Sequence, residues 1–248
     1  MTAKIASISG LRKTFPGPVE AVAGIDLDLV AGSVTALLGP TGCGKSTILR
    51  VLGGLESPTE GEVRIEPDVG VGFCFQEPRL LPWRTVRQNI ALPLELDRRP
   101  APEIRERVDR ELRTVGLVDA ADRLPAALSG GMKMRTAVAR TLVTDPSLLL
   151  LDEPFGALDE VTRYRLDEEL AELVRDAGPT VVLVTHSISE AVFLADEVVV
   201  LGPRPTRVLE RFTIDLGRRD AALRGTDEFA HLQSRIYDVL RSGMETVS

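Results

Sequence analysis

Short apolar runs recur along this chain of 248 residues, and turn-forming residues bound several of them. Runs of this kind are typical of strands that are buried on both faces of a parallel sheet. They lie at 34–38, 69–75, 146–152 and 180–186. Segments 4–9 and 25–30 instead alternate apolar and polar residues, which predicts half-buried antiparallel strands. Helical spacing of apolar residues is found at 46–53, 160–177 and 187–194. The pattern predicts an α/β fold with a helix-covered parallel sheet and an antiparallel β subdomain.

Residues 85–144 interrupt this order with helical segments and little strand character. Predicted helices span 85–92 and 102–115, where Gly116 is a stop, and another follows residues 128–132. We therefore expect an α-helical subdomain, at about 77–145, inserted into the core. Further strands are predicted at 62–66, 197–201 and 206–212, and residues 213–248 are expected to form a C-terminal tail with one amphipathic helix near 228–240.

Composition narrows the classes of protein that fit this pattern. Hydrophobic residues make up 44% of the chain, enough for a sizeable core, but no apolar run is long enough to span a membrane. The net charge of −7 and the aromatic content of 4% argue against a nucleic-acid-binding surface. Two cysteines and the lack of a secretory leader predict a reduced, cytoplasmic setting. The arginine pairs at 98–99 and 218–219 are expected to be solvated surface.

The segment at 39–46 fits the phosphate-binding pattern G-x-x-x-x-G-K-[ST] and lies between an apolar strand and a helix. The backbone N–H groups of such a loop, with a helix N-terminus behind them, form an anion-binding concavity. Lys45 can then reach the β- and γ-phosphates of a nucleotide, and the Ser46 hydroxyl can ligate Mg²⁺. The residues expected to bind nucleotide are Gly39, Pro40, Thr41, Gly42, Cys43, Gly44, Lys45, Ser46 and Thr47. Strand, loop and helix together predict a P-loop NTPase core of the RecA-like kind.

Polar residues also stand at the ends of three other predicted strands. Four leucines precede Asp152 and Glu153, which are expected to polarise the Mg²⁺ shell and to accept a proton from an attacking water, respectively. Gln76 follows one strand and His186 ends another, at the sheet edge where parallel sheets bind ligands. From the residues alone, Gln76 can also be an ordinary loop residue and His186 an ordinary surface residue.

Three further places in the chain have both a functional and a structural interpretation. Ser129 suits a helix N-cap, and Gly130 and Gly131 after it weaken the helix start but admit a ligand to its N–H groups. The alternative there is a plain N-cap. Asp159 is either the N-cap of the helix that follows or a link between sites. Phe15 lies in a turn-rich segment, where the residues favour a core or loop anchor.

In their order and spacing these motifs resemble the ATP-binding-cassette (ABC) ATPases over about residues 4–212. The Leu-Ser-Gly-Gly sequence at 128–131 is specific to that family, and Ala-Leu-Asp at 157–159 belongs to the same series. The resemblance implies an ABC ATPase domain at 1–212 that binds ATP and Mg²⁺.

The same resemblance implies roles for the residues left open above. Gln76 would sense Mg²⁺ and the attacking water, and His186 would contact the γ-phosphate. Phe15 would stack on adenine, at a place where the family often has Tyr. Asp159 would belong to the nucleotide site. The working unit would be a head-to-tail homodimer, in which residues 129–131 of one copy cover ATP bound at Lys45 of the other.

Finer details resemble the ATPases of nitrate, sulfonate and taurine importers. The stretches that carry this resemblance are 75–83, 130–132, 152–159 and 185–192. Met132 replaces the Gln common in the family, and Met134 stands where Gln often precedes Arg135. This group implies integral membrane permease subunits as partners and, through them, an extracytoplasmic solute-binding protein. The chain would then be peripheral, at the cytoplasmic face of the cell membrane.

Leu80, Leu81 and Trp83 are expected to anchor the permease, although they can alternatively pack internally. Functions outside import remain open for the same cassette: an exporter ATPase, a regulatory ATPase or a DNA-associated ATPase. The last needs coiled coils or DNA-binding insertions, whereas only 84 positions separate Lys45 from Ser129 and the net charge is −7.

Overall fold

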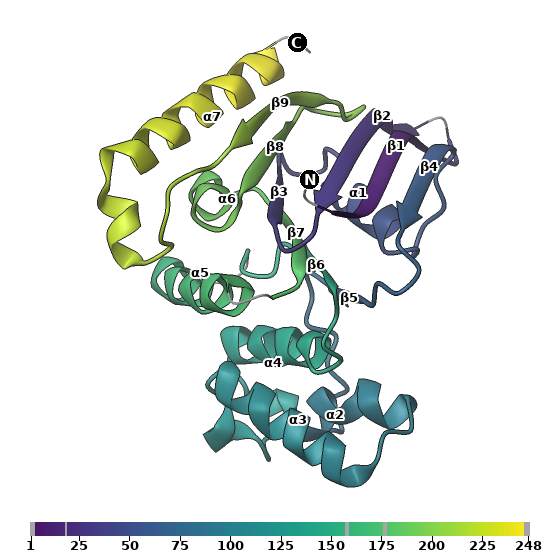
Figure 1. Cartoon of the computed structure of the whole chain (residues 1–248), viewed down its shortest axis with the longest axis vertical. Helices are drawn as coiled ribbons and strands as arrows, with labels where there is room; N and C mark the ends of the chain where they lie inside the picture. The colour runs from purple at the N-terminus through teal and green to yellow at the C-terminus, as the bar shows by residue number, and fades with distance from the viewer. Residues whose placement is uncertain (1–2, 18, 157–158, 176–177, 246–248) are drawn as a thin grey trace.

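A six-stranded sheet forms the centre of the molecule (Figure 1). The computed structural model describes residues 3–17, 19–156, 159–175 and 178–245. In spatial order the strands are β5 (Val71–Cys74), β6 (Leu148–Asp152), β7 (Thr180–Thr185), β3 (Val34–Leu38), β8 (Glu197–Leu201) and β9 (Val208–Thr213). Neighbouring strands are parallel from β5 to β8, and β9 is antiparallel to β8. The predicted parallel sheet is therefore confirmed.

Every residue of β3, β6 and β7 is buried, as the unbroken apolar runs predict. On β6, Leu149 and Leu151 pack with helices on one face of the sheet, whereas Leu148 and Leu150 pack with a helix and a second sheet on the other. Because side chains alternate along a strand, a run that is apolar throughout has to be covered on both sides. The register pairs Leu38 with Thr185, so that the strands end at a common edge.

The second sheet is antiparallel and has the order β2-β1-β4. Its strands are β1 (Lys4–Phe15), β2 (Val19–Val30) and β4 (Glu60–Ile65). Both β1 and β2 are longer than predicted, because register shifts between Ile8 and Leu11 interrupt the simple alternation without ending the pairing. Phe15 is consequently the last residue of β1 and lies outside a turn.

Three helices and two short 3₁₀ turns form the segment between β5 and β6. The helices are α2 (Val86–Leu96), α3 (Ala101–Thr114) and α4 (Gly130–Leu142), and the 3₁₀ turns are η1 (Val118–Ala120) and η2 (Pro125–Ala127). They pack around their own apolar cluster, which contains Ile90, Leu112 and Ala139, and lie together below the sheets in Figure 1. Helix α2 runs through Pro93 and does not stop before it as predicted. Leu94 is buried in the same cluster, and this packing outweighs the hydrogen bond that Pro93 cannot donate.

The remaining helices cover the central sheet. Helix α1 (Lys45–Leu52) lies on the face towards the antiparallel sheet, whereas α5 (Glu160–Arg175), α6 (Ile188–Leu194) and α7 (Asp227–Glu245) belong to the other face. Helix α7 extends beyond the predicted 228–240 at both ends and buries Phe229 and Ile236. No helix among the described residues has the length and apolar character needed to cross a membrane.

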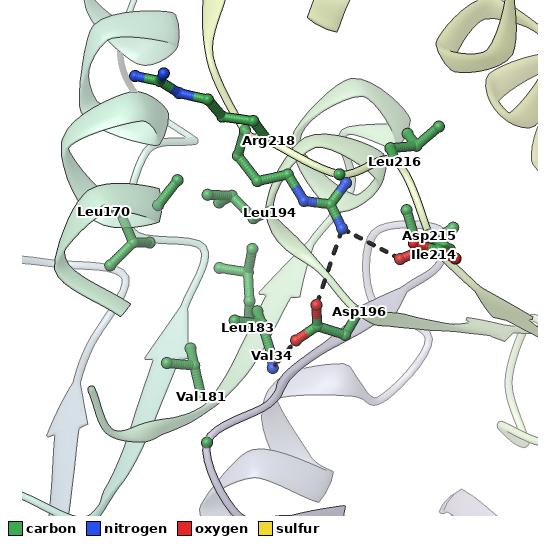
Figure 2. Close-up of a pocket in the computed structure, with 14 residues that line it drawn as sticks. Val34, Leu170, Val181, Leu183, Leu194, Asp196, Ile214, Asp215, Leu216 and Arg218 are labelled. Atoms are coloured by element: carbon green, nitrogen blue, oxygen red, sulfur yellow. Dashed lines mark hydrogen bonds and ion pairs between the residues drawn. The ribbon is translucent and has the colours of Figure 1, made fainter. Parts of the chain in front are cut away.

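The segment after β9 crosses α6 before α7 begins, and a cavity of about 670 Å³ lies beneath it. Figure 2 shows Leu170, Leu183 and Leu194 on the apolar wall of this cavity. Arg219 is 11% exposed and donates to the carbonyl oxygens of Ala195, at 2.8 Å, and Ile214, at 3.2 Å. The prediction that Arg218 and Arg219 are both solvated is therefore wrong for Arg219, whose charge sits among backbone acceptors.

Candidate functional site

The carboxyl ends of β3, β5, β6 and β7 meet at one edge of the central sheet. The phosphate loop follows β3, Gln76 comes shortly after β5, Asp152 and Glu153 end or follow β6, and His186 follows β7. Strand β7 lies between β3 and β6. The sheet thus brings together side chains that are more than 140 positions apart in the sequence, at the edge where open α/β sheets bind ligands.

The phosphate loop needs glycine at its end for steric reasons. Gly44 precedes α1 with φ +125°, and Gly42 has φ +77°. A Cβ on Gly44 would lie 2.9 Å from the backbone oxygen of Ala21 and 3.0 Å from Oγ1 of Thr206. The Cys43 side chain is buried in the core cluster beside α1, so this residue offers the site its backbone alone.

Lys45, the first residue of α1, is 3% exposed and points back over its own loop. Its Nζ donates to the carbonyl oxygens of Gly39, at 2.9 Å, and Pro40, at 3.0 Å. The same atom lies 3.7 Å from Oε1 of Glu153. The ammonium group is therefore held where the loop and the end of β6 meet.

Ser46 and Asp152 form a short polar contact between α1 and the end of β6. The Ser46 hydroxyl donates to Oδ1 of Asp152 at 2.6 Å. Burial raises the pKa of the Asp152 carboxyl, and the hydrogen bond from Ser46 partly offsets this rise. A hydroxyl and a carboxylate oxygen side by side are hard donors of the kind that Mg²⁺ prefers.

Glu153 is the residue on which the predicted catalytic side chains converge. Its Oε2 lies 3.2 Å from Nε2 of Gln76 and 3.1 Å from Nδ1 of His186. Its backbone has φ +46°, a left-handed conformation that is unfavourable for a residue with a side chain. A Cβ on Gly156 would lie 3.4 Å from Oε2 of Glu153, so Gly156 leaves room for this carboxylate. Two hydrogen-bonding partners and the strained backbone fix its direction.

The sequence analysis missed the residues that hold the phosphate loop from outside. Arg204 donates from Nη2 to the carbonyl oxygen of Gly42 at 2.7 Å, and the Thr206 hydroxyl donates to that of Cys43. Both belong to the turn between β8 and β9, where no motif marks them. Arg140 of α4 similarly donates to the carbonyl oxygens of Pro78 and Arg79, both at 2.9 Å, and so braces the loop after Gln76.

The predicted glycine-rich segment lies apart from the phosphate loop of its own chain. Ser129 is the N-cap of α4 and accepts from the N–H of Met132 at 3.3 Å, while Gly130 is exposed and Gly131 is half-buried. Among the described residues no hydrogen bond or ion pair joins residues 129–131 to residues 39–47. The segment instead lines an open cavity of about 420 Å³ together with Asp159 and Arg135.

Asp159 and Phe15 occupy positions that fit their structural interpretations. Asp159 accepts from the N–H of Thr162 at 2.9 Å at the start of α5, and this bonding lowers its pKa. Phe15 is half-buried against the core cluster beside α1, with Nζ of Lys13 4.9 Å from its ring centroid. Contacts of either residue with nucleotide remain predictions. Ala157 and Leu158, part of the predicted motif series, lie outside the described residues.

A buried acid pair lies behind His186. Asp167 of α5 and Glu190 of α6 are 1% and 3% exposed. Arg224 donates to Oδ2 of Asp167 at 2.7 Å. Burial raises the pKa of Asp167 to about 7, and Arg224 and Arg163 oppose this rise. Burial also raises the pKa of Glu190 to about 8, and the neighbouring Asp167 adds to the rise whereas Arg163 opposes it.

This acid pair predicts a pH-dependent stability. A carboxyl with a raised pKa in the folded state holds its proton there, so its stabilising contribution is complete below the unfolded pKa of about 4 and is lost as the pH rises through about 7 to 8. We expect the free energy of unfolding to fall from about pH 6 to about pH 9, and Glu190→Gln to reduce that fall. Urea unfolding at both pH values measures the difference, with the exposed Glu210→Gln as control. Equal pH slopes for Glu190→Gln and the parent chain would contradict it.

Residues 22–156 match the family described as ABC transporter. The aliphatic sulfonates import ATP-binding protein SsuB of Rhodopseudomonas palustris is 43% identical over 247 residues, covering 98% of this chain and 85% of that protein. SsuB of Pseudomonas putida is 46% identical over 233 residues, covering 92% and 82%. A dimeric post-hydrolysis state of the ATP-binding cassette MJ0796, bound to ADP and Pi, has a TM-score of 0.77 and 31% identity, covering 85% of this chain and 99% of its own.

The phosphate loop follows β3, Asp152 and Glu153 stand at the end of β6, and β7 lies between these two strands. This is the strand arrangement of a P-loop nucleoside triphosphatase. The family match spans more than half of the chain, and the two import ATP-binding relatives align with nearly all of it. This chain belongs to the ABC transporter family and is an ATP-binding, ATP-hydrolysing subunit of an ABC transporter.

Proposed function

We propose that this chain is the ATPase subunit of an importer and works as a homodimer at the cytoplasmic face of the membrane. Separate integral membrane permease subunits would carry the solute, delivered by an extracytoplasmic solute-binding protein. The observation that carries the proposal is the placement of Glu153 between Gln76, His186 and Lys45, which suits hydrolysis of a bound phosphate ester.

Glu153 has the geometry of a general base. Because Gln76 and His186 approach the same carboxylate oxygen from two different strand ends, the carboxylate keeps one orientation. A water beside it would give its proton to Glu153 while the water oxygen forms a bond to the γ-phosphorus. The bond from that phosphorus to the ADP oxygen breaks, and Lys45 would hold the γ-phosphate oxygens in line for the transfer.

The donor set at the base of the site fits Mg²⁺. Ser46 and Asp152 present a hydroxyl and a carboxylate 2.6 Å apart, and the Gln76 side chain lies on the next strand end. Ser46, Gln76 and Asp152 would hold the ion, directly or through water, as oxygen donors. When bound, it would neutralise charge that develops on the β- and γ-phosphates.

We infer the homodimer from the separation between residues 129–131 and the phosphate loop at 39–46. Residues 129–131 face an open cavity and not the phosphate loop of their own chain, so a second copy arranged head to tail is needed to bring them onto the nucleotide. A Cβ on Gly130 would meet no atom within 4 Å, which leaves its surface open to a partner. Asp159 lines the same cavity and would lie at this interface.

Permease docking is proposed on the helical subdomain. The side chain of Trp83 is 71% exposed, whereas Leu80 packs against two apolar clusters, so the expected anchor is Trp83 and the internal alternative holds for Leu80. A cavity of about 660 Å³ between α2 and α3 is lined by Ala91, Ile104 and other residues of the two helices. Exposed aromatic side chains, Trp in particular, are frequent anchors of protein interfaces.

The proposed solute is a small molecule of the nitrate, sulfonate or taurine kind, because the SsuB relatives are named for aliphatic sulfonate import. To test the function, the tagged chain is purified from mildly solubilised native membranes and its partners are identified by mass spectrometry. We expect a multi-span permease, together with a solute-binding protein that can be screened against these solutes. Trp83→Ala should lose the permease, while the exposed aromatic control Tyr237→Ala should keep it. Recovery of soluble or DNA-bound partners alone would overturn import.

A further inference from the structure

Arg224 is a side chain of the C-terminal segment that contacts two helices at once. It lies on the 3₁₀ turn η3 (Ala221–Gly225), just before α7, and is 12% exposed. Its Nη2 donates to Oδ2 of Asp167 at 2.7 Å, and its Nη1 donates to Oγ of Ser189 at 3.2 Å. The guanidinium group also stacks on the rings of Phe193, 3.8 Å from the centroid, and Tyr164, at 4.1 Å. One side chain thus joins α5, which carries Asp167 and Tyr164, to α6, which carries Ser189 and Phe193.

Helix α6 continues directly from the turn that carries His186. The Thr185 hydroxyl accepts from the N–H of Ser187 at 2.9 Å. Ser187 in turn is the N-cap of α6 and accepts from the N–H of Glu190 at 3.3 Å. The turn around His186 is therefore tied to the first turn of α6, and its position depends on where α6 lies.

The contacts of His186 leave little tolerance for movement of that turn. Its Nδ1 is 3.1 Å from Oε2 of Glu153, in the upper part of the range for a hydrogen bond between nitrogen and oxygen, so a small shift lengthens the bond beyond that range. Phe155, two residues after Glu153, accepts at its carbonyl oxygen from Nε of Arg163 on α5 at 3.3 Å. The relative position of α5 and α6 thus sets the distance between the two catalytic side chains.

We propose that Arg224 is a positioning residue for ATP hydrolysis, through which the C-terminal segment holds α5 against α6 and keeps His186 on Glu153. Arg224 itself touches neither Glu153 nor His186. It binds the buried carboxylate of Asp167 on α5 and stacks on Phe193 of α6, so its loss removes the side chain that ties the two helices together. Without this tie, α6 and the turn that carries His186 can shift relative to α5.

The inference rests on the proposed roles of Glu153 and His186. Its test is designed so that failure of the inference can be distinguished from failure of those proposed roles. Full-length Arg224→Gln is compared with the parent chain in steady-state ATP hydrolysis. We expect kcat to fall by about 10- to 100-fold, the effect of misplacing a catalytic group by about an ångström, while KM for ATP stays unchanged. Arg218→Gln, which removes an exposed arginine from the same segment, is the matched control and should keep its kcat.

Two further variants separate positioning from loss of folding. Arg224→Lys keeps the charge beside Asp167 but cannot also reach Ser189 and stack on Phe193, so its kcat should lie between those of Arg224→Gln and the parent chain. If Arg224→Gln does not fold, Ser189→Ala removes one of the same bonds and should lower kcat with KM unchanged. ATP binding measured on each preparation gives the folded fraction to which kcat is referred.

The ring of His186 supplies a readout that a merely stabilising residue would not change. The chain has two histidines, His186 and His231, so spectra of ¹⁵N-histidine-labelled protein hold two rings, and His231→Gln assigns them. We expect Arg224→Gln to shift the Nδ1 resonance of His186 and leave that of His231 in place. Unchanged kcat and an unchanged His186 resonance in folded Arg224→Gln would overturn the inference. Full hydrolysis by His186→Ala would overturn the proposed role of His186, and with it the inference.

Discussion

Replacing Glu153 with glutamine is expected to lower ATP turnover by about 10³-fold, within the range that general acid–base groups contribute, while ATP still binds. Glutamine has nearly the shape of glutamate and can keep a contact with Gln76 or His186, but it cannot accept a proton at pH 7. Lys45 keeps its bonds to the phosphate loop, because these do not involve Glu153. With binding intact and hydrolysis blocked, the dimer that ATP assembles should persist.

Three measurements check this expectation together: steady-state hydrolysis, equilibrium binding of ATP, and light scattering with and without ATP. Glu172→Gln, an exposed glutamate of α5, is the matched control and should behave as the parent chain. Turnover by Glu153→Gln close to that of the parent chain would remove Glu153 as the base. Loss of binding together with turnover would assign Glu153 to the nucleotide pocket and not to proton transfer.

Replacing Ser129 with arginine is expected to block hydrolysis, with a loss of about 10²-fold or more, and to leave nucleotide affinity of the monomer unchanged. Ser129 lies on an open cavity and makes no contact with the phosphate loop of its own chain among the described residues, so an effect on hydrolysis has to come from a second copy. A long charged side chain at this place would keep the two copies from closing over ATP.

A matched variant separates this obstruction from damage to α4. Ser129→Ala removes the same N-cap bond, at a cost of about 1 kcal/mol, but adds no bulk. It should therefore retain far more activity than Ser129→Arg at equal folded concentration. Hydrolysis and monomer binding are measured for both variants. Undiminished hydrolysis by Ser129→Arg would exclude the composite site between two copies.

The parts of the fold that the sequence predicts well are those in which a local pattern has one physical explanation. Runs such as 146–152 are apolar on both faces and have to be sandwiched, so β6 and its parallel neighbours follow directly. Because parallel strands end at one edge, the topology predicts Gln76, Glu153 and His186 at the same edge of the sheet, and in the structure Gln76 and His186 each lie within hydrogen-bond distance of Glu153.

Other features depend on contacts that no local pattern records. Pro93 is a helix breaker in sequence, but burial of Leu94 carries α2 past it. Arg204 and Arg224 look like surface arginines, yet one holds Gly42 and the other Asp167, each across a large distance in the chain. A long side chain can satisfy its charge on whatever backbone or carboxylate the fold brings near, and this partner is set only when the elements have packed.

Trp83 gives the molecule an optical property. It is the only tryptophan of the chain, and its indole is largely in water. Light at the long-wavelength edge of protein absorption is therefore absorbed by the Trp83 indole, which lies on the surface proposed to meet the permease. Emission from this indole is that of a wet environment in the free subunit, and any surface that covers it will move the emission to shorter wavelength. Assembly of the transporter can thus be followed in real time, without a label, from the wavelength of Trp83 fluorescence emission.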